Sequence, residues 1–196
     1  MRKVLFLFSA LTDGDVDWLV DNGRVRRVAG ASPLLTEGQA ASHLFIILEG
    51  RVAITSRRLG DLGVNGPGEI LGEIGFVTDG PSTATVRPSP MVTVLEVPRE
   101  RIAAKLATDG AFAGRFYRAI ARFLAHRLRY TVQADPTDQM EPDGTDNRIA
   151  PEFLDTLDVA GQRFAWLCRR CLDNGTGHAG TTVPSPLDDD WAEGTP

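Results

Sequence analysis

Hydrophobic and polar positions follow three patterns along this chain. Asp13 to Asn22 begins with acidic residues and ends before Gly23, which predicts a short leading helix. From Arg24 to Val97 the apolar residues come in short runs rich in Val, Ile and Thr, and glycines or prolines separate the runs. This second pattern predicts a compact antiparallel barrel or roll.

The third pattern begins near Pro98 and is helical. Pro98 to Gly110 carries a proline suited to a first helical turn and a terminal glycine, which predicts a short helix. Ala111 to Gln133 contains no proline, and its apolar residues recur at helical spacing, which predicts a long amphipathic helix. These residues are Phe112, Phe116, Ile120, Phe123, Leu124 and Leu128. Residues 1–133 are therefore expected to form one α+β domain: an antiparallel, jelly-roll-like β-roll (double-stranded β-helix) with a short leading helix and a short and a long helix behind it.

The rest of the chain divides into three segments. Residues 134–148 are acidic, contain two prolines and predict a linker, because they have too few apolar side chains to form a core. Residues 149–172 regain a helical period, and a helix of this length needs a surface to dock on. Its predicted apolar side consists of Phe153, Leu157, Ala160, Phe164, Leu167 and Cys171. Residues 173–196 predict a disordered acidic tail in which Trp191 is the candidate for a contact.

Charge and hydropathy narrow the classes of function. The net charge of -5 and the pI near 5.2 argue against a general affinity for nucleic acid, which needs a basic face. No run approaches the roughly 18 apolar residues of a membrane span. The apolar run from Val4 to Phe8 is shorter than the signal-peptide core of about 7–15 residues. We therefore expect a cytoplasmic protein whose first residues pack against the domain.

The residues that carry catalytic or metal chemistry are few and scattered. Cys168 and Cys171 have redox-motif spacing, but no βαβ pattern surrounds them and they continue the apolar side of a predicted helix. We expect reduced thiols that pack in a core. His43, His126 and His178 lie in different predicted elements, which disfavours a metal site, and no nucleophile motif is present. The chain is therefore not expected to be an enzyme.

Four arginines share one face of the long predicted helix. Arg115, Arg118, Arg122 and Arg129 recur at steps of three or four residues or their multiples, and the helix has no acidic residue. We expect a solvated face opposite the apolar side. An acidic partner, an anionic ligand or the acidic linker are the alternative occupants of this face.

The run from Gly72 to Val86, GEIGFVTDGPSTATV, has the composition of an anion-binding turn. Its glycines allow close approach, and such turns aim backbone N–H groups at an anion. The run resembles the phosphate-binding cassette of cyclic nucleotide-binding domains of the Crp or cAMP-receptor type, in which Gly-Glu and an apolar pair precede Pro-Arg-x-Ala-Thr. The matching residues are Gly72, Glu73, Ile74, Gly75, Phe76, Pro81, Thr83, Ala84 and Thr85. The order of the surrounding segments from Leu11 to Val132 is also similar to this family.

The resemblance implies a ligand and a role for each cassette residue. The ligand is cAMP or cGMP, and no other cofactor is expected. Glu73 would accept a hydrogen bond from the ribose hydroxyl, and small residues and backbone amides would surround the phosphate. The implied ligand-binding residues are Gly72, Glu73, Ile74, Gly75, Ser82, Thr83 and Ala84. Ser82 stands where the family has arginine, and losing that charged hydrogen bond, about 1.5–3 kcal/mol, weakens binding by one or more orders of magnitude.

Three functions are compatible with this resemblance. The first is a stand-alone bacterial sensor that signals through its C-terminal helices, with a homodimer contact over 111–133 and a protein partner at 149–172. The second is a degenerate module that binds no nucleotide and serves as a dimerisation or docking scaffold. The third, a Crp-like transcription regulator, is disfavoured because no second helix with a basic recognition face follows the long helix. Neither a membrane nor nucleic acid is expected as a partner.

Overall fold

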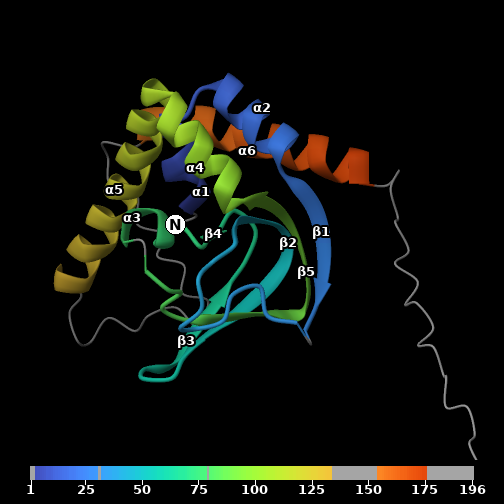
Figure 1. Ribbon diagram of the computed structural model, residues 1–196, viewed down its shortest axis with the longest axis vertical. Helices are drawn as coiled ribbons and strands as arrows, with labels where there is room; N and C mark the ends of the chain where they lie inside the picture. Colours follow the sequence, from blue (N-terminus) through green and yellow to red (C-terminus); the bar gives the residue numbers. More distant parts are fainter. Residues whose placement is uncertain (1–2, 31, 79, 134–153, 176–196) are drawn as a thin grey trace, which may run out of the picture.

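The computed structural model describes residues 3–30, 32–78, 80–133 and 154–175. Within these residues an antiparallel sheet is covered by helices at one end and along one side (Figure 1). This arrangement confirms the predicted α+β fold. In chain order the elements are α1 (Lys3–Ala10), α2 (Asp13–Asn22), β1 (Arg24–Ala29), β2 (His43–Ser56), β3 (Gly60–Asn65), β4 (Ile70–Leu71), α3 (Gly75–Thr78), β5 (Thr85–Pro98), α4 (Arg99–Thr108), α5 (Gly110–Gln133) and α6 (Leu154–Gly175).

The sheet is built on two long, bent strands. The strands are ordered β1-β5-β2-β3, and β4 pairs with β2. β2 and β5 pair antiparallel, and their register shifts on both sides of the Glu49–Gly50 step. Gly50 has a φ of 80°, and a side chain there would place its Cβ 2.3 Å from the carbonyl oxygen of Met91. Glycine therefore allows β2 to bend at this point and the sheet to close into a roll.

Both faces of β2 are buried from Leu44 to Leu48, which explains the continuous apolar run in this part of the strand. Leu44, Ile46 and Leu48 belong to the core under the helices, whereas Phe45 and Ile47 belong to the core inside the roll. Successive side chains of a strand lie on opposite faces, so each core receives alternate residues. The sheet therefore separates a roll interior from a helix-covered face.

The first residues form helix α1. The sequence predicts only a packing segment here, and the structure shows that this segment is helical. Val4, Phe6, Leu7 and Phe8 are buried, and the helix lies against α5 and α6. An eight-residue helix this apolar depends on its neighbours for stability, because so short a helix is marginal in water.

Helix α2 begins at a capping box and has the predicted bounds. Thr12 Oγ1 accepts a hydrogen bond from the Asp15 N–H at 3.2 Å, and Asp15 Oδ2 accepts one from the Thr12 N–H at 2.8 Å. These two reciprocal bonds satisfy backbone donors that a helix start leaves unpaired. Local side chains therefore determine where this helix starts.

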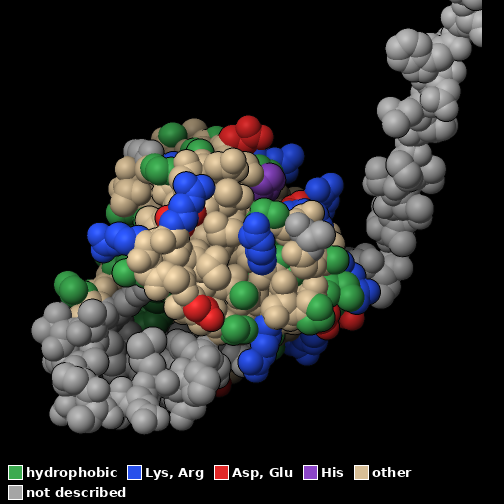
Figure 2. Space-filling view, turned by 90° about the horizontal axis from the view of Figure 1, so that it is seen from below, with side chains coloured by type: hydrophobic (Ala, Val, Ile, Leu, Met, Phe, Trp, Pro, Cys, Tyr) green, Lys and Arg blue, Asp and Glu red, His purple; other side chains and the backbone are tan. Residues whose placement is uncertain are grey.

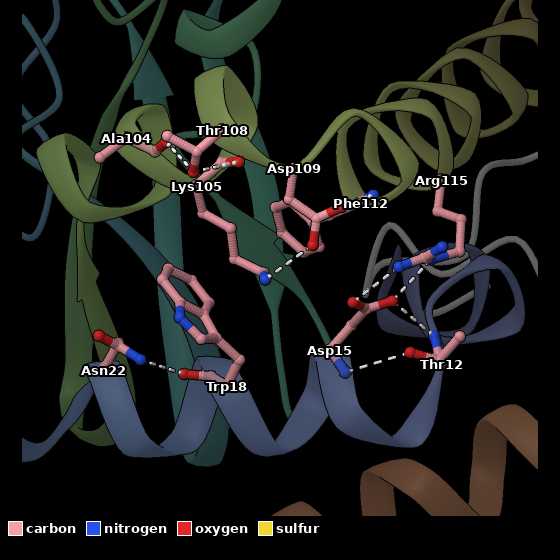
Figure 3. Close-up of polar contacts among 10 residues, drawn as sticks. All are labelled: Thr12, Asp15, Trp18, Asn22, Ala104, Lys105, Thr108, Asp109, Phe112 and Arg115. Atoms are coloured by element: carbon pink, nitrogen blue, oxygen red, sulfur yellow. Dashed lines mark hydrogen bonds and ion pairs between the residues drawn. The ribbon is translucent and has the colours of Figure 1, made fainter.

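Arg115 corrects the expectation of a solvated arginine face on α5. Its Nε and Nη2 donate to the two carboxylate oxygens of Asp15 at 2.7 and 2.9 Å (Figure 3). Arg118 and Arg122 are exposed, as predicted, and the side chain of Arg129 lies outside the described residues. One arginine of the stripe thus ties α5 to α2.

The apolar side of α5 is covered along its first half. Phe112, Phe116 and Ile120 are buried, as the helical period predicts. Phe123 and Leu124 are half-buried, and Leu128 is 65% exposed. The predicted apolar side therefore extends beyond the surface that the roll and α1 cover.

Helix α6 docks on α1 and α2, as the need of an isolated helix for a partner surface predicts. Its buried residues Ala160, Phe164, Leu167 and Cys171 belong to the helix-covered core. Burial raises the pKa of the Cys171 thiol to about 11, so the thiol stays protonated at neutral pH, in agreement with core packing. Residues 173–175, which the sequence assigns to the tail, belong to α6. The expected linker, the rest of the expected tail and the side chains of Phe153 and Leu157 lie outside the described residues. Among the described helices, none is long and apolar enough to cross a membrane.

Candidate ligand-binding cassette

The first half of the cassette is a tight turn between β4 and α3. Gly72 has a φ of 87°, and a Cβ there would lie 2.7 Å from the carbonyl oxygen of His43. Glycine is therefore required at this position. The carbonyl of Glu73 accepts from the Phe76 N–H at 3.1 Å, and that of Ile74 accepts from Val77 at 2.9 Å, so α3 starts directly after the turn.

The second half of the cassette is fixed to a neighbouring turn. The N–H of Ser82 donates to the carbonyl of Gln39 at 2.8 Å, and the N–H of Gly38 donates back to Ser82 at 2.9 Å. Among the described residues, none accepts a hydrogen bond from the backbone N–H of Thr83 or Ala84. Backbone N–H groups without an acceptor among the described residues are the kind of donor that an anion cup needs.

Glu73 is paired with a lysine of α1. Its side chain is buried, and the Nζ of Lys3 lies 3.0 Å from its Oε1. Lys3 Nζ also donates to the carbonyl of Ile70 at 3.1 Å and lies 4.0 Å from Oε2 of Glu69. The carboxylate that the resemblance assigns to a ribose hydroxyl is thus neutralised from within the chain.

A second buried carboxylate lies beside this pair. Glu69 Oε1 accepts a hydrogen bond from the backbone N–H of Lys3 at 3.4 Å. Burial raises the pKa of Glu69, and the positive charge of Lys3 opposes that rise. Two acidic side chains therefore share one ammonium group at the start of α1.

The space around Glu73 is small and apolar. Lys3 and Glu73 line a cavity of about 20 Å³, which is room for about one water molecule, whereas ligand pockets hold several hundred Å³. The other lining residues are Phe6, Leu7, Leu44, Ile70, Phe116, Ala119, Ile120 and Phe123. Ser82, Thr83 and Ala84 are not among the described residues that line it. This cavity therefore brings Glu73 together with Lys3 and with apolar side chains of α1, β2, β4 and α5.

Comparison with known proteins shows the family. The family model of the cyclic nucleotide-binding domain matches residues 25–109. The chain is 30% identical to the N-terminal domain of a transcriptional regulator from Streptomyces coelicolor A3(2), over 72% of this chain and 100% of that one, with a TM-score of 0.53. This chain belongs to the cyclic nucleotide-binding domain family.

More distant members share the fold. The catabolite activator protein of Thermus thermophilus is 18% identical over 87% of this chain and 88% of its own, with a TM-score of 0.53. A protein of Geobacter metallireducens GS-15 described as cyclic nucleotide-binding is 20% identical over 62% of this chain and 91% of its own, with a TM-score of 0.55. No curated protein matches the chain significantly.

Two cationic residues lie near the cassette but are not part of its sequence motif. Arg99, the first residue of α4, donates from Nη2 to the carbonyl of Gly75 at 2.7 Å and lies 4.7 Å from the Phe76 ring centroid. Lys3 reaches Glu73 from 70 residues away. The only sequence signal for Lys3 is its place in a cationic N-terminal run, which says nothing about its partner. Among the described residues no cluster suited to a metal ion occurs.

Proposed function

We propose that this chain is a non-enzymatic, cytoplasmic regulatory module that acts through protein contacts of its helices and does not bind a cyclic nucleotide in this conformation. The observation that supports this proposal is the pairing of Glu73 with Lys3 in a chain that has Ser82 in place of the family arginine. The ribose acceptor is occupied, and the phosphate partner is missing.

Two free-energy terms favour the state in which Lys3 occupies Glu73, which we call the closed cassette. A ligand that takes Glu73 from Lys3 breaks the shorter of the two ion pairs of a largely buried ammonium group, at a cost of up to about 3–5 kcal/mol. The neutral hydroxyl of Ser82 cannot replace the charged hydrogen bonds of a guanidinium, which contribute about 1.5–3 kcal/mol each. Both terms oppose the binding of a cyclic nucleotide.

The first of two contact surfaces that we propose lies on α5. Tyr117 is 44% exposed and Leu128 is 65% exposed, and Ala121 and Leu124 lie between them at helical spacing. An exposed apolar stripe of this kind fits a second copy of the same helix, so we propose a homodimer through residues 111–133. The apolar side of α6 is buried on α1, so a protein partner at 149–172 would meet its outward side.

Nucleic acid is not part of this proposal. On the face shown in Figure 2, the described Lys and Arg side chains lie singly among acidic and uncharged ones. This face, in a chain with a net charge of -5, does not offer the basic surface that phosphate neutralisation needs. Shifts of specific DNA in gels at physiological salt would contradict this view.

A nucleotide sensor is the second candidate, and the shape of the cassette favours it. The Gly72 turn is compatible with an anion, as are the N–H groups of Thr83 and Ala84, for which the described residues supply no acceptor. In this candidate cAMP or cGMP displaces Lys3 and shifts α5, and it does so only if it binds the two conformations with different affinity.

Calorimetric titration with cAMP and cGMP separates the two candidates. The wild-type chain should show no binding at millimolar nucleotide. Ser82→Arg should give weak binding because it restores the phosphate contact, and Ser82→Ala, the matched control, should give none. Micromolar binding by the wild-type chain would contradict the proposed function and support the sensor.

A further inference from the structure

We infer that Lys3 is the residue that decides whether a ligand can use Glu73: it occupies the carboxylate in cis and keeps the cassette closed. This inference rests on the proposed function and deepens it. Lys3 acts as a specificity-determining residue for this site, and its control is exercised by helix α1, which the family match over residues 25–109 does not include.

The contacts of Lys3 differ from those of an ordinary surface lysine. Its side chain is 15% exposed, and its Nζ meets Glu73, Glu69 and the Ile70 carbonyl within 4.0 Å. Its Nζ also lies over the ring of Phe123 in α5, 5.2 Å from the ring centroid. Among the described residues, Lys3 supplies the one cationic side chain within 4.0 Å of either carboxylate.

The first turn of α1 fixes Lys3 in this position. The N–H of Val4 donates to the carbonyl of Gly68 at 2.9 Å, so the backbone of α1 is bonded to the turn that precedes β4 and the cassette. Phe6 packs edge-on against Phe123 of α5, with centroids 5.9 Å apart. The start of α1 lies beside β4 and α3 in Figure 1. The cassette, α1 and α5 therefore meet at the Lys3 side chain.

Charge explains why a cyclic nucleotide cannot simply displace Lys3. A ribose hydroxyl is neutral, so it would leave Glu73 and Glu69 without a counter-ion in a buried site. The nucleotide also brings a phosphate anion toward two carboxylates. Ligand entry therefore requires both removal of the Lys3 charge from Glu73 and a new cation for the phosphate.

This requirement predicts synergy between two substitutions in the full chain. We compare the wild type with Lys3→Met, Ser82→Arg and the double variant, and titrate each with cAMP and cGMP by calorimetry. Methionine keeps the unbranched apolar stem and removes the charge. The double variant should bind at least about tenfold more tightly than Ser82→Arg, and Lys3→Arg with Ser82→Arg should behave like Ser82→Arg alone.

The outcomes separate this inference from the proposed function. If the double variant binds within about twofold of Ser82→Arg, or does not bind, Lys3 does not close the cassette. If the wild type binds at micromolar nucleotide, the proposed function fails, and the Lys3 inference then requires Lys3→Met to bind about tenfold more tightly than the wild type. Equal affinity of Lys3→Met and the wild type would overturn the Lys3 inference.

A second variant and a second measurement protect the test against misfolding. If Lys3→Met does not fold, Lys3→Gln takes its place. The double variant Lys3→Gln with Ser82→Arg should then bind at least about tenfold more tightly than Ser82→Arg alone. Amide hydrogen exchange without ligand should be faster at Val4, whose N–H is bonded to Gly68, in Lys3→Met than in Lys105→Met. Lys105 is the control because it pairs with Asp109, within α4 and its C-cap. Unchanged exchange at Val4 would contradict the inference.

Discussion

Asp15 is a buried carboxylate that receives hydrogen bonds from two helices. The N–H of Thr12 donates to it at the start of α2, and the guanidinium of Arg115 donates two bonds from α5. Burial alone raises the pKa of Asp15, but the bonds from Arg115 and Thr12 outweigh burial and lower it. The ionised form is therefore the one that the folded state prefers.

Asp15→Asn should reduce the free energy of unfolding by about 2–4 kcal/mol at pH 7, because Arg115 loses its counter-ion and the capping box is weakened. The contribution of a carboxylate with a lowered pKa is present above its ordinary value and is lost as pH falls through the lowered one. The difference in free energy of unfolding between the variant and the wild type, measured by urea titration, should therefore shrink below about pH 4. Asp17→Asn, at a more exposed ion pair, is the control and should change stability by less than about 1 kcal/mol.

Glu69→Gln should raise the free energy of unfolding at pH 7, whereas Asp15→Asn should lower it. The folded state raises the pKa of Glu69, so the stability that its protonation provides is present at low pH and is lost as pH rises through the raised value. Glutamine is neutral and keeps an oxygen that accepts from the Lys3 N–H. Urea midpoints should be higher than those of the wild type at pH 7 and equal to them at acid pH, whereas exposed Glu100→Gln should show no such dependence. A lower midpoint at pH 7 would contradict this view of Glu69.

Among the elements, α2 and α1 show which parts of the fold a sequence reveals. The start and end of α2 follow from Thr12, Asp15 and Gly23, which are neighbours in the sequence, so its bounds are predictable. Helix α1 owes its conformation to α5 and α6, which lie far away in the sequence. Its eight residues have no polar side with a helical period, so the pattern indicates burial without showing the helix.

The candidate site also combines features that the sequence predicts with contacts that it does not predict. The Gly72 turn and the position of Ser82 follow from a local motif, and the structure shows both in the cassette. The partner of Glu73 depends on how α1 docks, and no spacing in the sequence relates residues 70 apart. Arg115 is a similar case, because its helical face is predictable but its bond to Asp15, 100 residues away, is not.

Helix α6 should contribute to stability through its buried side. Leu167 is fully buried in the core that α6 shares with α1 and α2. Leu167→Ala should lower the free energy of unfolding by about 2–5 kcal/mol, because it removes apolar contacts and leaves a cavity. Arg169→Ala, at an exposed position of the same helix, should stay within about 0.5 kcal/mol. Equal urea midpoints for Leu167→Ala and the wild type would show that α6 is not docked in solution.

For the whole molecule, the helices combine two roles. Their inner sides cover one face of the sheet, and the outer side of α5 carries the exposed stripe that includes Tyr117 and Leu128. A dimer through this stripe would place two copies of the Lys3 contact near one interface, since Phe123 of α5 lies against Lys3. Opening of the cassette and the position of α5 would then be coupled.

Leu128→Glu should convert the proposed homodimer into a monomer, because it places a charge in an apolar contact. Light scattering during gel filtration measures the mass directly. Leu59→Glu, at an exposed residue between β2 and β3, is the matched control and should leave the dimer intact. A monomeric wild type, or a dimer that persists in Leu128→Glu, would exclude this interface.

The ion pair between Lys3 and Glu73 should hold α1 against the cassette. A double-mutant cycle with Lys3→Met and Glu73→Gln, read as the free energy of unfolding in urea at pH 7, measures their coupling without any ligand. The contacts of 3.0 Å between largely buried groups predict a coupling energy of about 1–3 kcal/mol. Additive effects of the two substitutions, with a coupling below about 0.5 kcal/mol, would contradict the claim.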